Sequence, residues 1–282
     1  VLSWAGVSGL VTVTLGMPLA ATKLYLHGIS VDQEFRTEYL TRFTDTAALR
    51  DMTYVDLPPF YPAGWFWVGG GVANVLGMDG WEVFKPYAIA SLAVAAAVAV
   101  VLWSELVRSD LAVLVATATT AIVLAYGSPE PYGAIIALLI APALVLAWGA
   151  LAPVRDSGSS DYRKRARQGW GAVAGTGLFL GLAATFYTLY LGIAAFAVTV
   201  MAVVAAYLAR RAAGSWRAVL PVLVRLVVIA VIAMLVALIV WAPFVFDVLG
   251  GNPPSESGTA THYLPDAGAR LPLPMFHMSL IG

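Results

Sequence analysis

The longest uncharged stretch decides which class of protein this chain belongs to. From Gly169 to Ala209 the sequence runs for 41 residues without a single Asp, Glu, Lys or Arg. About 20 consecutive apolar residues are enough for a helix to cross the hydrocarbon core of a bilayer, so this stretch can cross it twice. Charged residues make up only 11% of the chain, whereas ordinary soluble domains carry about 25%. The sequence therefore predicts an integral membrane protein.

Further apolar segments predict an all-α, polytopic bundle of helices. Inside a bilayer every backbone polar group must be satisfied within the protein, and an α-helix achieves this within one segment. We expect residues 1–246 to form one transmembrane domain, followed by a loop over 247–282 that is rich in Pro, Gly and Ser. The chain begins without Met, and we expect it to be an incomplete part of a longer protein. The expected spans are 1–24, 87–107, 111–126, 132–153, 169–188, 190–209 and 226–246.

Basic residues predict which ends of the spans face the cytoplasm. Lys and Arg are concentrated in the loops 154–168 and 209–217, and loops of this kind stay on the cytoplasmic side. Counting back from them puts residues 27–80 on the extracytoplasmic face of the plasma membrane, together with the loop after the last span. This count requires that 58–80 does not cross. Its Pro and Gly residues disfavour a continuous helix, so we expect a surface-lying or re-entrant element with its aromatic side chains at the membrane interface.

Residues 27–57 contain the most promising acidic group. Phe35, Tyr39 and Phe43 recur every four residues, which predicts an amphipathic helix. Ser30 and the Gln three residues later resemble a capping box, which would place Asp32 at the mouth of this helix. A carboxylate there could accept a proton from a hydroxyl group. Alternatively, Asp32 and its neighbour Glu34 only stabilise the positive end of the helix dipole.

Other candidate residues share the predicted extracytoplasmic face. Glu130 lies in a tight turn between two apolar spans, and a carboxylate at a membrane face is a functional candidate; the alternative is a solvated turn residue. Three cations, Arg36, Lys85 and Arg270, could bind a phosphate group, although each could equally make a headgroup contact or a salt bridge.

The aromatic residues Tyr61 and Trp65 and the tail residue His262 are candidate contacts for a sugar or lipid. The plain alternatives are interfacial packing for the aromatics and a surface position for the His. The chain has no Cys, which excludes disulfides, thiolate zinc sites and a Cys nucleophile. Three His are too few for a His-rich metal site. A net charge of zero gives no indication of a nucleic-acid partner.

Two motifs resemble a known family. The stretch from Asp32 to Arg42 directly follows the first span, and Leu57 to Trp67 is rich in Pro and aromatic residues. Together they resemble the GT-C class of glycosyltransferases, which use lipid-phosphate-linked sugars. They are most similar to the arabinofuranosyltransferases that attach the first arabinose residues to galactan in mycobacterial-type cell walls. The similarity is sharpest over residues 30–68.

The resemblance implies a GT-C-like helical bundle and particular substrates. The donor would be decaprenyl-phosphoryl-arabinose and the acceptor galactan, both reached from the extracytoplasmic side among membrane lipids. It implies that Asp32 is the catalytic base, with Glu34 as the neighbouring candidate, and that Glu130 occupies the place of a second acid. Some members use a divalent metal, which makes one possible here, although the sequence has no convincing ligand cluster.

We expect inverting direct displacement, in which Asp32 deprotonates the 5-hydroxyl of a galactose unit and a cation such as Arg36 stabilises the leaving phosphate. The alternative is a polytopic transporter or lipid flippase. Transporters place ionisable residues or broken helices near the middle of the bilayer, whereas the spans expected here are almost free of charge. A third interpretation is a membrane scaffold without enzymatic activity, in which the clustered acids and aromatics have no chemical role.

Overall fold

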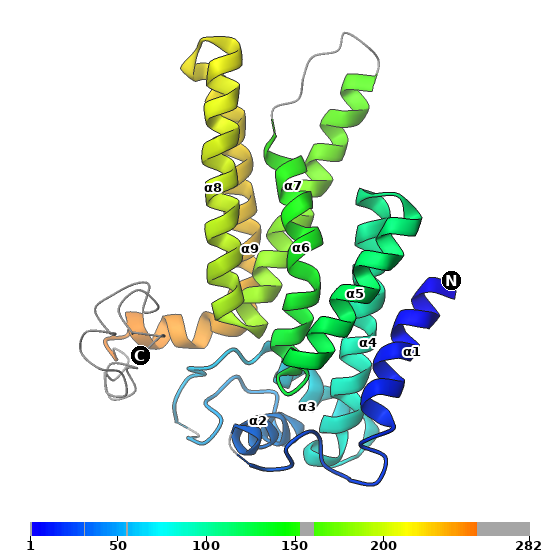
Figure 1. The fold of residues 1–282 in the computed structure, drawn as a ribbon. Helices are drawn as coiled ribbons and strands as arrows, with labels where there is room; N and C mark the ends of the chain where they lie inside the picture. Colours follow the sequence, from blue (N-terminus) through cyan, green and yellow to red (C-terminus); the bar gives the residue numbers. More distant parts are fainter. Residues whose placement is uncertain (1, 31, 55, 153–160, 253–282) are drawn as a thin grey trace, which may run out of the picture. The chain divides into compact units, whose positions relative to one another are not determined.

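The computed structural model describes residues 2–30, 32–54, 56–152 and 161–252, without the side chains of 161–168. The chain divides into two compact units, Val1–Pro243 and Phe244–Gly282, and the contacts discussed below lie within the first. All regular elements of the described residues are helices, which confirms the predicted all-α class (Figure 1). They are α1 (Leu2–Gly16), α2 (Gln33–Asp45), α3 (Gly64–Leu76), α4 (Gly80–Leu106), α5 (Ser109–Gly127), α6 (Pro131–Leu151), α7 (Asp161–Phe186), α8 (Thr188–Ala213), the 3-10 helix η1 (Trp216–Val219) and α9 (Leu220–Leu249).

Six helices are long and apolar enough to cross a membrane, as expected for a polytopic protein. These are α4, α5, α6, α7 from Gly169 onward, α8, and the continuous segment Trp216–Leu249. The break between the two spans predicted inside the uncharged stretch falls at Tyr187, where the backbone is extended. Two of these helices begin earlier than expected: α4 at Gly80 and not near residue 87, and α9 at Leu220 and not near residue 226. Glu82, Lys85 and Pro86 suggested a loop, yet they lie within the first turns of α4.

The first predicted span is shorter in the structure than in the sequence-based expectation. We expected residues 1–24, but α1 ends at Gly16 and has 15 residues, roughly 22 Å of helix. Pro18 follows, and the residue before a proline disfavours helical backbone angles. Residues 17–21 continue as turns. The helix packs on α4, where the hydroxyl of Ser8 donates to the carbonyl of Ala93 at 3.2 Å.

Residues 58–80 contain the short helix α3, which packs against α2 at one end of the spans (Figure 1). Its 13 residues are fewer than the 20 or so that a crossing requires. Gly70 allows α3 to approach Phe43 of α2 so closely that an added Cβ would meet the Phe43 backbone. The expectation of interfacial aromatics fails for Trp65 and Phe66. Both are fully buried: Trp65 packs on Tyr87 of α4, and both rings pack on Tyr132 at the start of α6.

Glycines also set the approach of α7 to α9. An added Cβ at Gly177 would lie 2.7 Å from the Cβ of Ile232, and one at Gly181 would meet the Cβ of Val236. Small residues four apart on a membrane helix let two backbones pack closely, and van der Waals contact then replaces the hydrophobic effect that is absent in lipid.

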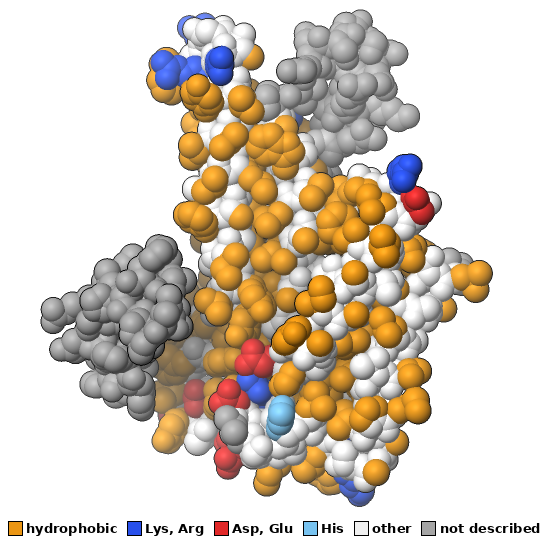
Figure 2. Space-filling view, in the orientation of Figure 1, with side chains coloured by type: hydrophobic (Ala, Val, Ile, Leu, Met, Phe, Trp, Pro, Cys, Tyr) orange, Lys and Arg blue, Asp and Glu red, His pale blue; other side chains and the backbone are white. Residues whose placement is uncertain are grey.

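The last turn of α8 is basic, and it lies at the opposite end of the spans from α2, where most of the acidic residues are (Figure 2). Tyr187 precedes the first residue of α8, and Arg210 and Arg211 lie in its last turn. The 26 residues between these ends correspond to about 39 Å. Figure 2 shows basic side chains at the far end of α8, and acidic side chains gathered toward the opposite end of the spans.

We predict that Gly181→Ala lowers the thermal stability of the protein, although alanine is the better helix former by about 1 kcal/mol. The added methyl group must displace Val236, and overpacking of this kind costs about 1–3 kcal/mol. Gly171→Ala is the matched control on the same helix, because nothing lies within 4 Å of its Cβ position. Thermal unfolding in detergent should show a lower midpoint only for Gly181→Ala; equal midpoints would contradict the close packing.

We also predict that the end of the spans that carries α2 and α3 faces the outside of the cell. Because the chain has no Cys, Ala47→Cys and Ala213→Cys each introduce one thiol at an exposed position. A membrane-impermeant maleimide should label residue 47 on intact cells, and residue 213 only after the membrane is permeabilised. The reverse pattern, or the same pattern for both thiols, would refute this topology.

Candidate functional site

A buried guanidinium joins α2 to the start of α6. Arg36 is only 4% exposed, and its side chain is surrounded by acceptors. Its Nη2 forms ion pairs with Glu130 and with Oδ2 of Asp32, the latter at 3.4 Å. Its Nε donates to the hydroxyl of Tyr132 at 2.9 Å, and its Nη1 to the carbonyl of Pro129 at 3.5 Å. A buried charge needs this number of partners, because its lost hydration is otherwise uncompensated.

The local sequence explains why these groups meet. Asp32 and Arg36 are four residues apart, and such pairs are neighbours on a helix surface. Glu130 occupies the N-cap position of α6, where a negative charge is favoured by the helix dipole. Pro131 follows at the first helical position, which suits its missing N–H and fixed φ.

The capping box predicted for α2 does not form. Asp32 occupies the N-cap position, but its side chain makes no capping hydrogen bond. The hydroxyl of Ser30 donates to the carbonyl of His27 at 2.7 Å. The amide of Gln33 donates instead to the carbonyl of Pro129 at 2.9 Å. A contact with the start of α6 therefore replaces the local one, and it ties the first turn of α2 to the Glu130 turn.

Three tyrosines complete the polar cluster. The hydroxyls of Tyr61 and Tyr132 are 2.8 Å apart, and Tyr187 donates to Oε2 of Glu130 at 3.1 Å. Burial, together with the adjacent Glu130 carboxylate, raises the pKa of Tyr187 to about 12. Burial also raises the pKa of Tyr61. Both phenols thus stay protonated near neutral pH and can donate hydrogen bonds.

The two acids of the cluster differ in how much of each carboxylate is free. Glu130 is held through both oxygens, by Arg36 and by Tyr187, and its side chain is 36% exposed. Asp32 is 60% exposed. Its Oδ2 faces Arg36, while its Oδ1 accepts no hydrogen bond from any residue that the structure describes. Asp32 is therefore the acid that can receive a proton from a molecule outside the protein.

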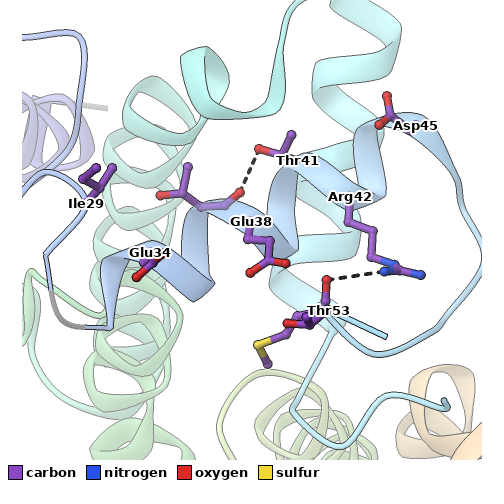
Figure 3. A pocket seen from close by; sticks show the side chains of 9 residues that line it. Ile29, Glu34, Glu38, Thr41, Arg42, Asp45 and Thr53 are labelled. Atoms are coloured by element: carbon purple, nitrogen blue, oxygen red, sulfur yellow. Dashed lines mark hydrogen bonds between the residues drawn. The ribbon is translucent and has the colours of Figure 1, made fainter. Parts of the chain in front are cut away.

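The remaining sequence-based candidates lie in different surroundings. Glu34 is exposed on the face of α2 opposite Arg36, where it lines a groove (Figure 3). The ammonium of Lys85 donates to the carbonyls of Leu19 and Thr22, away from the cluster. Trp65 packs its ring 5.9 Å from that of Tyr132. Its indole N–H donates to the Ser91 hydroxyl.

Two predicted residues, His262 and Arg270, lie outside the described residues. Sequence reasoning did not identify Gln33, Tyr132 or Tyr187 as part of the site. A weak signal exists for the two tyrosines: one follows the Pro-Glu-Pro turn directly, and the other lies inside the uncharged stretch, between the two spans predicted there.

A divalent metal was a possibility on sequence grounds, but the described residues do not provide a set of ligands for one. No group of three or more His, Cys, Asp or Glu side chains placed to hold a metal ion occurs within residues 2–252 as far as they are described. Asp32 and Glu130 both pair with the guanidinium of Arg36, which balances one of their two negative charges. The use of a metal stays a prediction.

An apolar cavity lies on the other side of the aromatic residues. It has a volume of about 440 Å³ and is formed by α3, α4, α6 and α7. Its wall includes Trp65, Tyr87, Val94, Ile135 and Phe186. Since Trp65 also contacts Tyr132, the aromatic side chains separate the ion pairs from this cavity.

The amino-acid sequence of the chain is similar to the sequences of enzymes from other organisms. It is 53% identical over 279 residues to the galactan 5-O-arabinofuranosyltransferase of Mycolicibacterium smegmatis, covering 99% of this chain and 42% of the relative. The enzyme of the same name from Corynebacterium glutamicum is 42% identical over 281 residues, covering 99% of this chain and 39% of the relative. The chain thus spans about two fifths of the length of these relatives.

The chain also matches the sequence model of a protein family. The model described as arabinofuranosyltransferase N terminal matches residues 1–282, the full length of the sequence. The similarity therefore extends well beyond the motifs at residues 30–68 and includes the spans that hold Glu130 and Tyr187 in place. On this evidence, the chain belongs to the arabinofuranosyltransferase N-terminal family.

Proposed function

We propose that this chain forms the membrane part of a glycosyltransferase that moves an arabinofuranosyl group from decaprenyl-phosphoryl-arabinose to galactan. The relatives named galactan 5-O-arabinofuranosyltransferase support the sugar and the acceptor. The observation that carries the proposal is the carboxylate of Asp32, which Arg36 holds on one side and which is open on the other. We place this site on the extracytoplasmic face of the plasma membrane.

The proposed reaction is a single displacement with inversion at the anomeric carbon. Asp32 takes the proton from the 5-hydroxyl of a galactose unit as that oxygen bonds to the anomeric carbon of arabinose. The bond from this carbon to the phosphate oxygen breaks, and polyprenyl phosphate leaves with the electron pair. A phosphate leaving group needs no acid catalyst, so one base is sufficient for the protein's part in proton transfer.

Arg36 fits a positioning role better than direct phosphate binding. Its side chain is 5% exposed and already has four protein partners. A guanidinium is a rigid fork that fixes the carboxylates it binds, so it can hold Asp32 in one orientation. The assignment of Arg36 to the donor phosphate stays a prediction, and so do those of Lys85 and Arg270.

The apolar cavity behind Trp65 supports a donor with a lipid chain. Its walls are apolar side chains, and Val94 on its rim is 62% exposed on the surface of a helix long enough to cross the membrane. A polyprenyl chain could enter from the bilayer and bring its phosphate toward the polar cluster. Van der Waals contact with the cavity walls would hold the chain there, because the hydrophobic effect does not act between apolar groups in lipid.

A transporter or flippase is supported less well. Buried polar residues of the described spans are Thr120, Ser128, Thr176 and Thr185, and each hydroxyl donates to a carbonyl of its own helix. These residues offer no chain of polar groups across the bundle, whereas transport sites use ionisable residues or broken helices near the midplane.

Asp32→Asn in the full-length enzyme should lower kcat by about 10²–10⁴-fold, the usual contribution of a general base. Donor affinity should change little, and the thermal midpoint should fall less than in Glu130→Gln, because Asn has nearly the same shape, the Asp32 side chain is 60% exposed, and Glu130 still pairs with Arg36. The transfer of radiolabelled arabinose to a galactan acceptor measures the rate. Glu34→Gln is the control and should lower kcat far less, since Glu34 points to the other face of α2, away from Arg36; a change in its KM for the acceptor does not bear on this comparison. Normal turnover of Asp32→Asn would remove it from catalysis.

Glu130→Gln should lower both kcat and the thermal midpoint. The change leaves the buried Arg36 without its closest carboxylate, which costs up to about 3 kcal/mol. Asp110→Asn is the control. It breaks the ion pair between Arg108 and Asp110, whose side chains are 83% and 70% exposed, and it should change neither kcat nor the thermal midpoint because exposed pairs contribute little.

Arg36→Lys compares the two roles considered for Arg36. A rise confined to the donor KM would assign Arg36 to the donor phosphate.

A further inference from the structure

A groove lined by both charged and apolar side chains runs along the face of α2 that points away from Arg36. It has a volume of about 460 Å³ and includes Glu34, Glu38, Thr41 and Asp45 of this helix. The loop residues Met52 and Thr53 form its other side, and Arg42 reaches across to them (Figure 3). The reaction described above does not use this groove.

The spacing of the α2 residues gives the groove its length. Glu34, Glu38, Thr41 and Asp45 follow one another at intervals of three or four, so they share one face of the helix. From the first to the last the helix rises roughly 16 Å. The groove is therefore long enough for several units of a chain molecule, and not only for one small ligand.

The lining of the groove favours a neutral ligand with many hydroxyl groups. Among the described residues, Glu34, Glu38 and Asp45 take part in no ion pair, so their oxygens are free to accept hydrogen bonds. Three carboxylates against the one guanidinium of Arg42 leave the groove with a net negative charge, which would repel a phosphate or another anion. The lipid-phosphate donor is therefore a poor ligand for this groove, whereas carbohydrate hydroxyls are suitable donors.

Hydroxyl and guanidinium groups in the groove complete this match. Thr37 and Thr41 donate their hydroxyl protons to backbone carbonyls of α2, which leaves their oxygens as acceptors. Arg42 supplies donors through its guanidinium, whose Nη1 reaches the carbonyl of Met52 at 3.4 Å across the groove. Met52 and Ile29 add apolar surface for the C–H faces of sugar rings.

We propose that this groove binds the acceptor as an oligosaccharide chain laid along α2, with its reacting end toward Asp32. Ile29 and Glu34 line the groove and flank Asp32 in the chain. The proposal rests on the proposed transferase function and deepens it, because it assigns the acceptor and the donor lipid to opposite sides of the Arg36 cluster. Glu34, a candidate for catalysis on sequence grounds, becomes an acceptor-binding residue.

The test compares long and short acceptors with the full-length enzyme. In Glu38→Ala, the KM for a galactan oligosaccharide of several units should rise about tenfold, the loss expected for a hydrogen bond to a charged group. The KM for a galactose disaccharide, the donor KM and kcat should stay as in the wild type, because these do not depend on distant sugar contacts. Thr41→Val, which keeps the shape of the side chain, should act in the same direction more weakly.

Asp56→Ala is the matched control, since it removes an exposed acid that lies outside the groove. An unchanged KM for the long acceptor in Glu38→Ala would overturn the proposal, as would an equal loss with long and short acceptors. Titration of the same oligosaccharide into the purified full-length protein gives a readout without turnover. Weaker binding by Glu38→Ala than by Asp56→Ala supports the groove even if arabinose transfer is absent, which would refute only the proposed reaction.

Discussion

Burial of the Arg36 guanidinium is the interaction on which the rest of the site depends. The charge is almost fully removed from solvent, and its partners come from the turn before α2 and from the start of α6. Removing Glu130 from this arrangement would leave the buried charge with Asp32 as its one carboxylate partner among those described, and such losses are large. Asp32 thus acquires a fixed position even though its own side chain is largely exposed.

The tyrosines around this ion pair separate two environments. The hydroxyls of Tyr132 and Tyr187 point into the polar cluster, and the Tyr132 ring packs on Trp65 and Phe66. Aromatic side chains with one polar atom suit such a boundary. A carboxylate open to solution and an apolar cavity consequently lie close together, an arrangement that matches a substrate composed of a sugar, a phosphate and a lipid chain.

Hydropathy was enough to predict the helical class and most of the spans, because each span must satisfy its backbone alone. The four-residue spacing of Phe35, Tyr39 and Phe43 likewise predicted α2. The start of α4 was missed because the charges of Glu82 and Lys85 suggested a loop. The carbonyls that accept hydrogen bonds from the Lys85 ammonium come from a distant part of the chain, so the local sequence around Lys85 does not predict these contacts.

The candidate site was predictable only in its separate parts. Asp32, Arg36 and Glu130 each stood out by residue type and position, but their common ion pair joins residues 94 positions apart. Gln33 shows the same limit: the local pattern predicted a cap, and a tertiary partner took its amide instead. Burial of Trp65 depends on Tyr87 of α4 and Tyr132 of α6, which are distant in sequence and come together only in the packed fold.

The position of Tyr187 has a consequence for the order in which the molecule is assembled. It lies at the tip of the α7–α8 hairpin, more than 50 residues beyond the carboxylate that it binds. A chain emerging from the ribosome presents Asp32, Arg36 and Glu130 long before this phenol has been made. The ion pair can form as soon as α6 is inserted, but Oε2 of Glu130 can accept the hydrogen bond from Tyr187 only after the hairpin has been inserted. Insertion of α7 and α8 is therefore the step that completes the polar cluster during biogenesis.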